Sequence, residues 1–260
     1  MHDPVQTIDT DVTKKKLSNL EQINILLLGI DASENDKGRS DAIMIMRLNP
    51  KKDEMTLVSI PRDARVEIVG KGTVDKINHA FAFGGAEMSI ETVENFLNIE
   101  IDYYVQMNMD GLVELVNELG TITVENDIAW SEKGYDFPKG LVEMDGKKTM
   151  TFVRMRKKDP SGDFGRTMRQ RKVIEGIIQK GASVGSIPKF LNIMDVLGAN
   201  MATNMEFNDM KAIFSGYKNT RKNTVEHMID GTGTRMNGIY YLIVPDEEIN
   251  KAHDLLTSPS

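Results

Sequence analysis

The sequence predicts an α/β protein with a mixed central sheet. Residues 23–29 form a near-continuous apolar run of strand length, which is typical of a strand buried on both faces. Further along the chain, strand-like runs alternate with segments whose apolar residues recur at helical spacing. The chain has 260 residues, 40% of them hydrophobic, and no interior linker, so it can build one large core.

The first 20 residues differ from the rest of the chain. They are polar, include three consecutive lysines at positions 14–16 and show no apolar periodicity. This pattern predicts a flexible polar leader, or juxtamembrane linker, over residues 1–20. Residues 21–260 are then expected to form a single domain.

A hairpin is expected after the first strand. Residues 42–48 form a second buried-strand pattern, and the turn signal at 49–53 predicts that residues 55–60 return antiparallel to it. Pro61 ends this return strand because proline cannot donate to a ladder. We therefore expect Arg62 to face outward at the end of the sheet.

Periodicity and end signals predict the remaining elements. Asp110 and Asp145 are candidate helix N-caps, and Thr167 with Gln170 has the spacing of a capping box. A terminal helix opens at Pro245 and Asp246. The other predicted helices and strands are helices 86–97, 110–118, 145–154, 168–180, 188–197 and 206–217, and strands 103–107, 121–124, 224–229 and 239–244.

Composition excludes several classes of function. A net charge of -7 and a pI near 5.3 argue against a broad nucleic-acid interface, which needs an extended positive face. No apolar stretch approaches the 18 residues of a membrane span. The absence of cysteine excludes disulfides and thiolate chemistry without identifying a compartment. The four histidines are scattered and show no metal-ligand spacing.

Arginine is concentrated in one segment. Five of the eleven arginines lie between positions 154 and 171, and Arg39 and Arg62 stand at the ends of other predicted elements. Planar five-donor cations at such density favour a site for a multiply charged phosphate. On the predicted helix 168–180, Arg166 and Gln170 would lie near the N-terminal turn, whose backbone donors also attract anions. A solvated basic helix face is the alternative for the run, and a capping role is the alternative for Gln170.

Two aspartates at predicted strand ends are candidate metal ligands. Asp31 stands just past the first strand, and Asp41 precedes the second. Carboxylate oxygens beside phosphate-binding arginines suit Mg²⁺, which usually takes one or two carboxylates together with phosphate oxygens. Taken singly, each aspartate would more simply cap a turn.

Seven short motifs in a fixed order resemble those of the LytR-CpsA-Psr family, over roughly residues 21–245. They are Leu28-Gly29-Ile30-Asp31, Gly38-Arg39-Ser40-Asp41, Ser59-Ile60-Pro61-Arg62-Asp63, Lys76-Ile77-Asn78-His79-Ala80 with Gly84-Gly85, Asp145-Gly146, Arg154-Met155-Arg156, and Asp163-Phe164-Gly165-Arg166 with Arg169-Gln170. The resemblance implies a three-layer α/β/α sandwich with an apolar pocket for a polyprenyl tail. The chain departs from the family at Ser33, where an arginine is frequent, and at Thr121, where a second glycine is frequent.

The resemblance also implies an activity. Family members are phosphotransferases that move an anionic glycopolymer, such as wall teichoic acid, from an undecaprenyl-diphosphate carrier to the muramic acid 6-hydroxyl of peptidoglycan. They act at the extracytoplasmic face of the cell membrane through an N-terminal membrane helix, which this chain does not contain. The expected protein is thus the ectodomain of a single-pass membrane protein, monomeric and without a nucleic-acid partner.

Site roles follow from the resemblance, position by position. Asp31 and Asp41 would hold Mg²⁺, with Mn²⁺ as the alternative ion. Arg62 and Arg166 would also stabilise the charge that develops during transfer, and Asp163 is the candidate general base, although nearby cations weaken a base. The residues expected to hold the pyrophosphate are Arg39, Arg62, Arg154, Arg156, Arg166 and Gln170.

Two alternatives to the transferase remain open at this point. One is a non-catalytic regulator that binds polyprenyl phosphate, and the other is a metal-dependent pyrophosphatase that uses water as the acceptor. Products separate them, because a hydrolase releases polymer phosphate without peptidoglycan. The sequence does not identify the polymer, the acceptor glycan or the residues of the lipid pocket.

Overall fold

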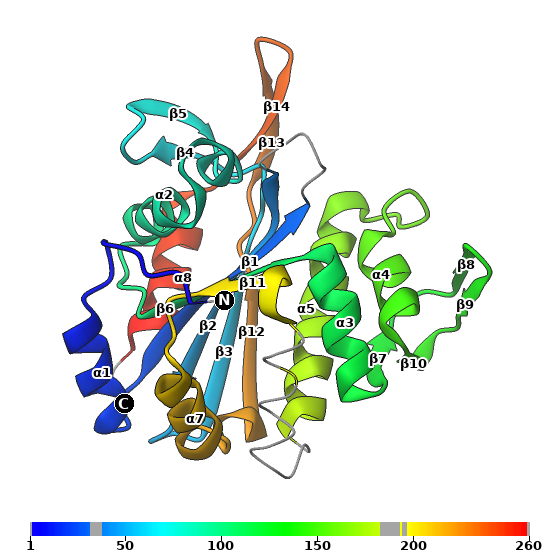
Figure 1. Cartoon of the computed structure of the whole chain (residues 1–260). Coiled ribbons are helices and arrows are strands. Elements are labelled where there is room, and N and C mark those ends of the chain that lie inside the picture. The colour runs from blue at the N-terminus through cyan, green and yellow to red at the C-terminus, as the bar shows by residue number, and fades with distance from the viewer. Residues whose placement is uncertain (1, 32–37, 183–192, 194–196, 259–260) are drawn as a thin grey trace. The chain divides into compact units, whose positions relative to one another are not determined.

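A mixed six-stranded sheet, in the order β11-β6-β1-β2-β3-β12, is the largest sheet in the described part of the chain (Figure 1). β1 pairs antiparallel with β2, β2 pairs antiparallel with β3, and β12 runs parallel to β3. The predicted α/β class and the hairpin of the second and third strands are therefore confirmed. The strands are β1 (Ile23–Asp31), β2 (Arg39–Asn49), β3 (Glu54–Ile60), β6 (Tyr103–Asn108), β11 (Met201–Thr203) and β12 (Asn223–Met228).

The computed structural model describes residues 2–31, 38–182, 193 and 197–258. The chain divides into two units, each with more contacts inside it than to the other. We call residues 2–106 with 202–260 the sheet unit and residues 107–201 the insert unit, and each is considered by itself. The assignment of residues 21–260 to one domain stays a prediction.

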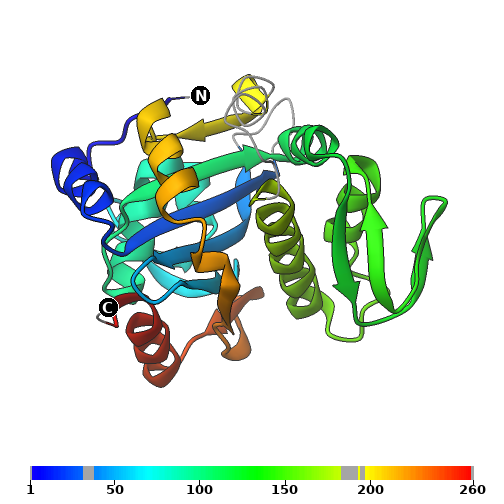
Figure 2. The ribbon, with the colours of Figure 1, turned by 90° about the horizontal axis from the view of Figure 1, so that it is seen from below.

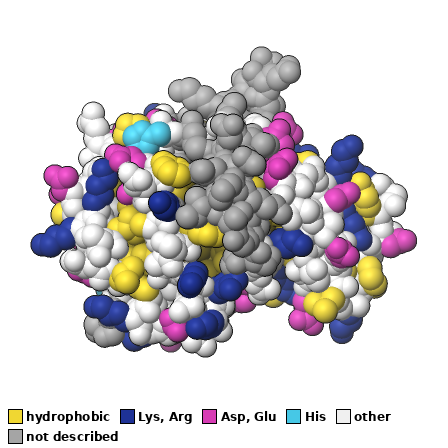
Figure 3. All heavy atoms as spheres, turned by 60° about the horizontal axis from the view of Figure 1, so that its bottom comes forward, with side chains coloured by type: hydrophobic (Ala, Val, Ile, Leu, Met, Phe, Trp, Pro, Cys, Tyr) yellow, Lys and Arg dark blue, Asp and Glu magenta, His cyan; other side chains and the backbone are white. Residues whose placement is uncertain are grey.

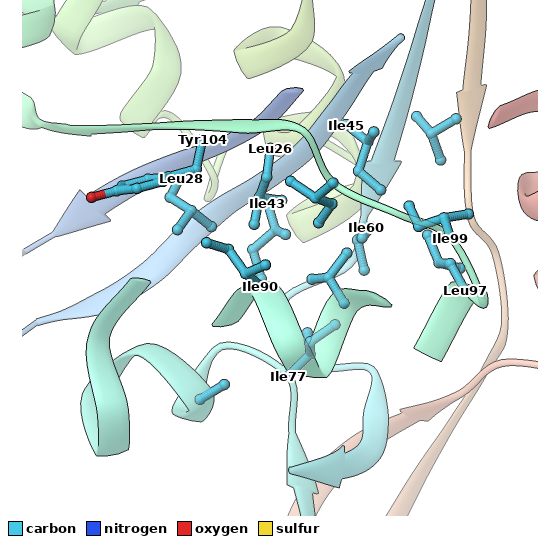
Figure 4. Close-up of a cluster of buried hydrophobic side chains, with 14 of the residues drawn as sticks. Leu26, Leu28, Ile43, Ile45, Ile60, Ile77, Ile90, Leu97, Ile99 and Tyr104 are labelled. Carbon is cyan, nitrogen blue, oxygen red and sulfur yellow. The ribbon is translucent and has the colours of Figure 1, made fainter. Parts of the chain in front are cut away.

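The main core of the sheet unit lies between the sheet and the helices α2 (His79–Leu97) and α8 (Asp246–Thr257). Leu26, Ile43 and Ile60 point from three neighbouring strands toward Ile90 of α2 (Figure 4). Leu26 is fully buried, as the apolar run of the first strand predicted. Such burial supplies most of the stability of a sheet of this kind.

The helix predicted over residues 86–97 is the second part of α2. Gly84 and Gly85 have non-helical backbone angles inside α2, and Gly85 has a φ of 68°. Glycine adopts this left-handed region without steric cost, so the pair bends the helix between its two parts. The first part begins at His79, seven residues before the predicted start.

The first 20 residues do not form the expected featureless leader. Residues Thr10–Ser18 form helix α1, with Asp9 accepting hydrogen bonds from the backbone of its first turn. Leu17 is buried, and Lys16 donates to the carboxylate of buried Asp102 at 2.8 Å. The prediction of a flexible leader was wrong for residues 10–18, because buried Leu17 and ion pairs of Lys14 and Lys16 with distant acids hold this helix, and such contacts produce no periodic apolar pattern.

Leu17→Ala tests whether α1 contributes to the fold. Removing a buried leucine side chain should lower the free energy of unfolding by about 2–3 kcal/mol. Urea denaturation followed by circular dichroism measures the change. Val12→Ala on the same helix is the matched control, since Val12 is 46% exposed and should change stability by less than about 0.5 kcal/mol. If both variants changed the free energy of unfolding equally little, residues 1–20 would again be interpreted as a flexible leader.

The described residues of the sheet unit also form two hairpins and two further helical segments. The hairpins are β4 (Arg65–Ile68) with β5 (Thr73–Lys76) and β13 (Thr232–Met236) with β14 (Ile239–Ile243). Only β14 was predicted, because the other three strands are short and lack a long apolar run. The helical segments are α7 (Phe207–Gly216) and the 3-10 turn η2 (Thr220–Lys222).

In the insert unit, helices pack against a two-stranded sheet (Figure 2). Phe152 of α4 and Val173 of α5 share a core with Val124 of β7 and Val142 of β10. The elements of this unit are α3 (Met109–Leu119), β7 (Ile122–Asn126), β8 (Trp130–Glu132), β9 (Tyr135–Phe137), β10 (Gly140–Met144), α4 (Gly146–Arg154), α5 (Gly162–Ala182) and the 3-10 turn η1 (Gly198–Asn200).

Helix starts in the insert unit were predicted with mixed success. Asp145 accepts from the backbone N–H of Lys148 and caps α4, as predicted. The cap of α3 is Asn108, whose side chain accepts from Gly111, so the choice of Asp110 was wrong. Most of the predicted helix 188–197 lies outside the described residues.

Candidate functional site

Asp41 and Arg62 form an ion pair at one end of the β2–β3 ladder. The register pairs Ile43 with Ile60, so Asp41 and Arg62 extend beyond the last paired residues of neighbouring strands. Nη1 of Arg62 lies 2.9 Å from each carboxylate oxygen of Asp41. Only 19% of the Arg62 side chain is exposed. The expectation that Arg62 faces outward was wrong, because a carboxylate stands beside it on the adjacent strand.

Two further charged groups extend this pair. Nζ of Lys76 lies 2.6 Å from Oδ1 of Asp63, and Nε of Arg62 lies 3.8 Å from Oδ2 of Asp63. Acid and base therefore alternate through Asp41, Arg62, Asp63 and Lys76, which we call the strand-end cluster. Carboxylates on two sides fix the arginine in position, as binding of a phosphate requires. Asp63 and Lys76 lie inside the motifs Ser59-Ile60-Pro61-Arg62-Asp63 and Lys76-Ile77-Asn78-His79-Ala80, but neither was predicted as a site residue.

Asp75 links the start of α2 to the C-terminal hairpin. Its carboxylate accepts from the backbone of Lys76 at 2.8 Å, lies 2.8 Å from Nδ1 of His79 and accepts from the hydroxyl of Tyr241 at 3.3 Å. Burial is the largest single effect and raises the pKa of Asp75, but the contacts with His79, the Lys76 backbone and Tyr241 together outweigh it, so the net effect lowers the pKa. These contacts hold His79 at the first residue of α2.

Asp31 and Arg39 meet at the end of the β1–β2 ladder. They are paired residues in the register, and both are exposed. A bulge between Gly29 and Ile30 shifts the register just before them. A Cβ at Gly29 would lie 2.9 Å from Cβ of Ala42, so glycine permits the close approach of the strands there. The sheet unit thus holds four of the predicted site residues, Asp31, Arg39, Asp41 and Arg62.

The donor chemistry of Asp31 and Asp41 fits a hard cation. A carboxylate has about four lone-pair sites, so the two oxygens of Asp41 that accept from Arg62 keep further acceptor capacity. Within the described residues no group of three or more histidine, cysteine, aspartate or glutamate side chains is placed to hold a metal. Two carboxylates suffice where phosphate oxygens complete the coordination. The magnesium assignment stays a prediction.

A second group of charges lies between α4 and α5 in the insert unit. Arg154 ends α4, and Arg156 follows it with 58% of its side chain exposed. Nη2 of Arg166 lies 2.8 Å from Oδ1 of Asp163, and Nε of Arg156 lies 3.9 Å from the same oxygen. We call these four residues the helix-start cluster, because Asp163 lies in the first turn of α5. The cluster combines the held cation of Arg166 and the exposed cations of Arg154 and Arg156 with the N-terminal end of a 21-residue helix, where anions are stabilised.

The other two arginines of the run are buried and have acidic partners. Arg169 forms an ion pair with Asp159 and donates to the backbone carbonyl of Met155. Arg171 has its Nε 3.8 Å from Oε1 of Glu175. Burial is the largest single effect and raises the pKa of Asp159, but the hydrogen bonds from Arg169 and Ser161 together with the charge of Arg169 outweigh it, so the net effect lowers the pKa. Arginine density therefore arises from two roles, and only the helix-start cluster is placed to meet an anion.

Gln170 does not belong to a capping box. Helix α5 begins at Gly162, so Thr167 lies inside it and donates to the carbonyl of Asp163. Gln170 is 8% exposed, and its Oε1 has no hydrogen-bond partner among the described residues. A buried amide oxygen without a partner costs free energy, which favours the ligand-contact alternative. That role stays a prediction.

On the described part of the face in Figure 3, Lys and Arg side chains are interspersed with Asp and Glu side chains. The absence of a nucleic-acid partner stays a prediction. Over the described residues, no helix is both long and apolar enough to span a bilayer.

Comparison with known proteins gives consistent matches over nearly the whole chain. The profile of the LytR_cpsA_psr family matches residues 2–258. The polyisoprenyl-teichoic acid–peptidoglycan teichoic acid transferase TagU of Bacillus licheniformis is 46% identical over 244 residues, covering 91% of this chain and 80% of the relative. The crystal structure of B. subtilis TagU is 42% identical with a TM-score of 0.74, covering 91% of this chain and 95% of that one. A structure of TagT bound to LIIa-WTA is 31% identical with a TM-score of 0.78, covering 91% and 89% of the two chains.

Proposed function

The chain belongs to the LytR-CpsA-Psr family, and on that premise we propose that it is an enzyme that transfers a teichoic acid or a related anionic glycopolymer from a polyisoprenyl carrier to peptidoglycan. The observation that carries this proposal is the 46% identity, over 91% of the chain, to a transferase named for that reaction. Because peptidoglycan lies outside the cytoplasmic membrane, we also place this domain on the extracytoplasmic side. Membrane anchoring and the monomeric state stay predictions.

We propose the following chemistry for the transfer. The donor is an undecaprenyl-diphosphate-linked polymer, and the acceptor is the 6-hydroxyl of muramic acid. The hydroxyl oxygen forms a bond to the sugar-proximal phosphorus, and the bond from that phosphorus to the bridging oxygen breaks. Undecaprenyl phosphate leaves with the bond electrons, and the hydroxyl proton passes to a base. The product is a phosphodiester between polymer and peptidoglycan.

Fixed cations carry most of the catalytic work in this proposal. Phosphoryl transfer depends chiefly on positioning and on stabilising charge around phosphorus. Arg62 is held between Asp41 and Asp63, and Arg166 is held by Asp163, so neither has to reorganise when charge develops. Arg39, Arg154, Arg156 and Gln170 are proposed as further contacts of the pyrophosphate. That both clusters act on one pyrophosphate stays a prediction.

Asp163 is the proposed base for the hydroxyl proton. Its carboxylate lies 2.8 Å from Nη2 of Arg166, and this ion pair orients it. A carboxylate within hydrogen-bond reach of the acceptor hydroxyl can take its proton as the bond to phosphorus forms.

Asp31 and Asp41 are the proposed ligands of Mg²⁺, with Mn²⁺ as the alternative ion. A bound divalent cation would neutralise charge on the pyrophosphate oxygens. Asp41 holds Arg62 in either case, so its contribution to arginine position does not depend on the ion.

The test of the proposed function is product analysis. The protein is incubated with Mg²⁺, a short undecaprenyl-diphosphate-linked teichoic acid precursor and uncross-linked peptidoglycan, and the products are identified by mass spectrometry. We expect a polymer–peptidoglycan phosphodiester adduct that disappears with chelator and returns when Mg²⁺ or Mn²⁺ is added.

Three other results would each change the conclusion. Polymer phosphate released in the absence of peptidoglycan would indicate the pyrophosphatase. Donor binding without any product would indicate the regulator. An adduct that forms at full rate in chelator would support the transferase and remove the metal from the proposal.

A further inference from the structure

The tip of the β13–β14 hairpin exposes an unusual amount of apolar surface. The hairpin projects from the sheet unit (Figure 1) and turns through Asn237 and Gly238, which have φ angles of 51° and 82°. Met236 and Ile239 flank this turn and are 40% and 49% exposed, and Tyr240 is 42% exposed. Large side chains exposed together in this way indicate a contact with something outside the chain.

The exposed side chains lie on both faces of the hairpin. Consecutive residues of a strand point to opposite faces, so Ile239 and Tyr240 point to opposite sides of β14. A folded partner that docks on a hairpin covers one face of it. Exposure on both faces instead suits insertion of the whole tip into a fluid apolar medium.

The neighbouring β4–β5 hairpin continues this surface. The backbone N–H of Leu242 in β14 donates to the carbonyl of Asp63 at 2.8 Å, and Ala64 forms a bridge with Leu242, so the two hairpins adjoin. Val74 of β5 is 47% exposed, and Phe83 at the start of α2 is 40% exposed. Both hairpins lie at the same end of the sheet unit in Figure 1.

Basic side chains accompany the apolar ones. Nζ of Lys71 lies 4.6 Å from the ring centre of Phe83, and the guanidinium of Arg65 lies 5.9 Å from that of Tyr241. Arg235 sits directly before the tip. The exposed charged residues of the two hairpins are Arg65, Lys71 and Arg235 against a single acid, Glu67, in a chain whose net charge is -7. This local excess of positive charge complements an anionic surface.

We propose that the two hairpins form a bilayer-docking surface, in which Met236, Ile239 and Tyr240 enter the headgroup region of an anionic phospholipid membrane while Arg65, Lys71 and Arg235 contact its phosphates. Aromatic and aliphatic side chains with basic neighbours are the composition that binds at this interface. This inference rests on the proposed function, because a polyisoprenyl carrier resides in the bilayer.

The geometry connects the docking surface to the strand-end cluster. The backbone of Leu242 hydrogen-bonds to Asp63, a member of that cluster, and Ile239 lies three residues nearer the tip of the hairpin. At roughly 3.3 Å per strand residue the tip extends about 10 Å beyond this contact, similar to the roughly 5–10 Å that interfacial elements penetrate. Docking would therefore hold the strand-end cluster close to the membrane surface, where the diphosphate of the carrier lies.

Vesicle binding tests the proposal without any donor, so its outcome is independent of the transfer reaction. The protein is floated with vesicles of phosphatidylglycerol and phosphatidylcholine. Because two half-exposed apolar side chains are lost, the variant carrying Met236→Ser and Ile239→Ser should bind on the order of tenfold more weakly. Leu141→Ser in the insert unit is the matched control, since Leu141 is 77% exposed and should leave binding unchanged. Thermal unfolding checks that all variants fold.

A depth measurement separates insertion from simple attraction by charge. Ile239→Trp should show quenching by lipids brominated along the acyl chain, whereas Leu141→Trp should show none beyond that of the wild type. Equal vesicle binding by the serine variant and the wild type, or an unquenched Trp at position 239, would overturn the proposal. If the protein binds vesicles as expected but transfers no polymer from any donor, the docking surface is supported and the proposed function is contradicted.

Discussion

Replacing Arg62 by alanine should lower kcat/KM for polymer transfer by about 100-fold or more, because a fixed donor to developing charge is worth that much in a preorganised site. Arg62 lies 2.9 Å from both oxygens of Asp41 and 3.8 Å from Asp63, with 19% of its side chain exposed. The effect should fall mainly on kcat, since charge develops on the pyrophosphate during the reaction. A mass-spectrometric initial-rate assay with the lipid-linked donor measures it.

Two companion variants make this result specific. Arg221→Ala removes an exposed arginine of the same unit and should leave the rate unchanged within about twofold. Arg62→Lys keeps the charge and loses the planar pair of donors, so its rate should lie between those of wild type and alanine variant. Wild-type activity in Arg62→Ala would remove this residue from the site. Asp41 loses its partner in Arg62→Ala, which could destabilise the protein. Unfolding curves therefore check that a lower rate does not result from unfolded protein.

The same assay tests whether the two clusters serve one substrate. Arg166→Ala alone is also expected to reduce the rate by about 100-fold or more. If both arginines stabilise one transition state, the double variant with Arg62→Ala should lose less than the product of the two single losses. Strictly multiplicative losses would indicate that the strand-end and helix-start clusters act independently.

The sequence predicted the centre of the fold well and its periphery poorly. Residues 23–29 and 55–60 are recognisable because strands buried in the sheet are mostly apolar along their length. Helix α1 depends on Leu17 and on the contact between Lys16 and Asp102, which joins residues 86 positions apart. Contacts of that range leave no local pattern, so a polar helix looked like a linker.

The positions of the candidate site residues were also only partly predictable from the sequence. Pro61 correctly marked the end of a strand, but the orientation of Arg62 depends on Asp41, which stands on the adjacent strand. The density of arginines between positions 154 and 171 suggested a site for a multiply charged phosphate, and that role stays a prediction. It could not separate exposed Arg156 from buried Arg169, because burial is decided by how the loop between two helices folds back.

Arg169→Ala should lower the free energy of unfolding by about 3–5 kcal/mol, because it leaves the carboxylate of Asp159 buried without its cation. Both side chains are less than 10% exposed, at 7% and 8%. Arg169 also donates to the carbonyl of Met155 and thereby closes the loop between α4 and α5. Lys158→Ala is the matched control in the same segment, since its ion pair with Glu132 is exposed and should contribute less than about 1 kcal/mol.

The dependence of this stabilisation on pH distinguishes the ion pair from simple packing. The pKa of Asp159 is lowered in the folded protein, so its charged carboxylate stabilises the fold at pH values above the pKa of an aspartate in the unfolded chain. That contribution is lost as the pH falls through the lower, folded-state pKa. The free energies of unfolding of the wild type and of Asp159→Asn should therefore differ at pH 7 and converge in acid. A difference that stays constant with pH would mean that Asp159 contributes by packing and not by charge. The hydrogen bond from Arg169 to the carbonyl of Met155 would then hold the loop between α4 and α5.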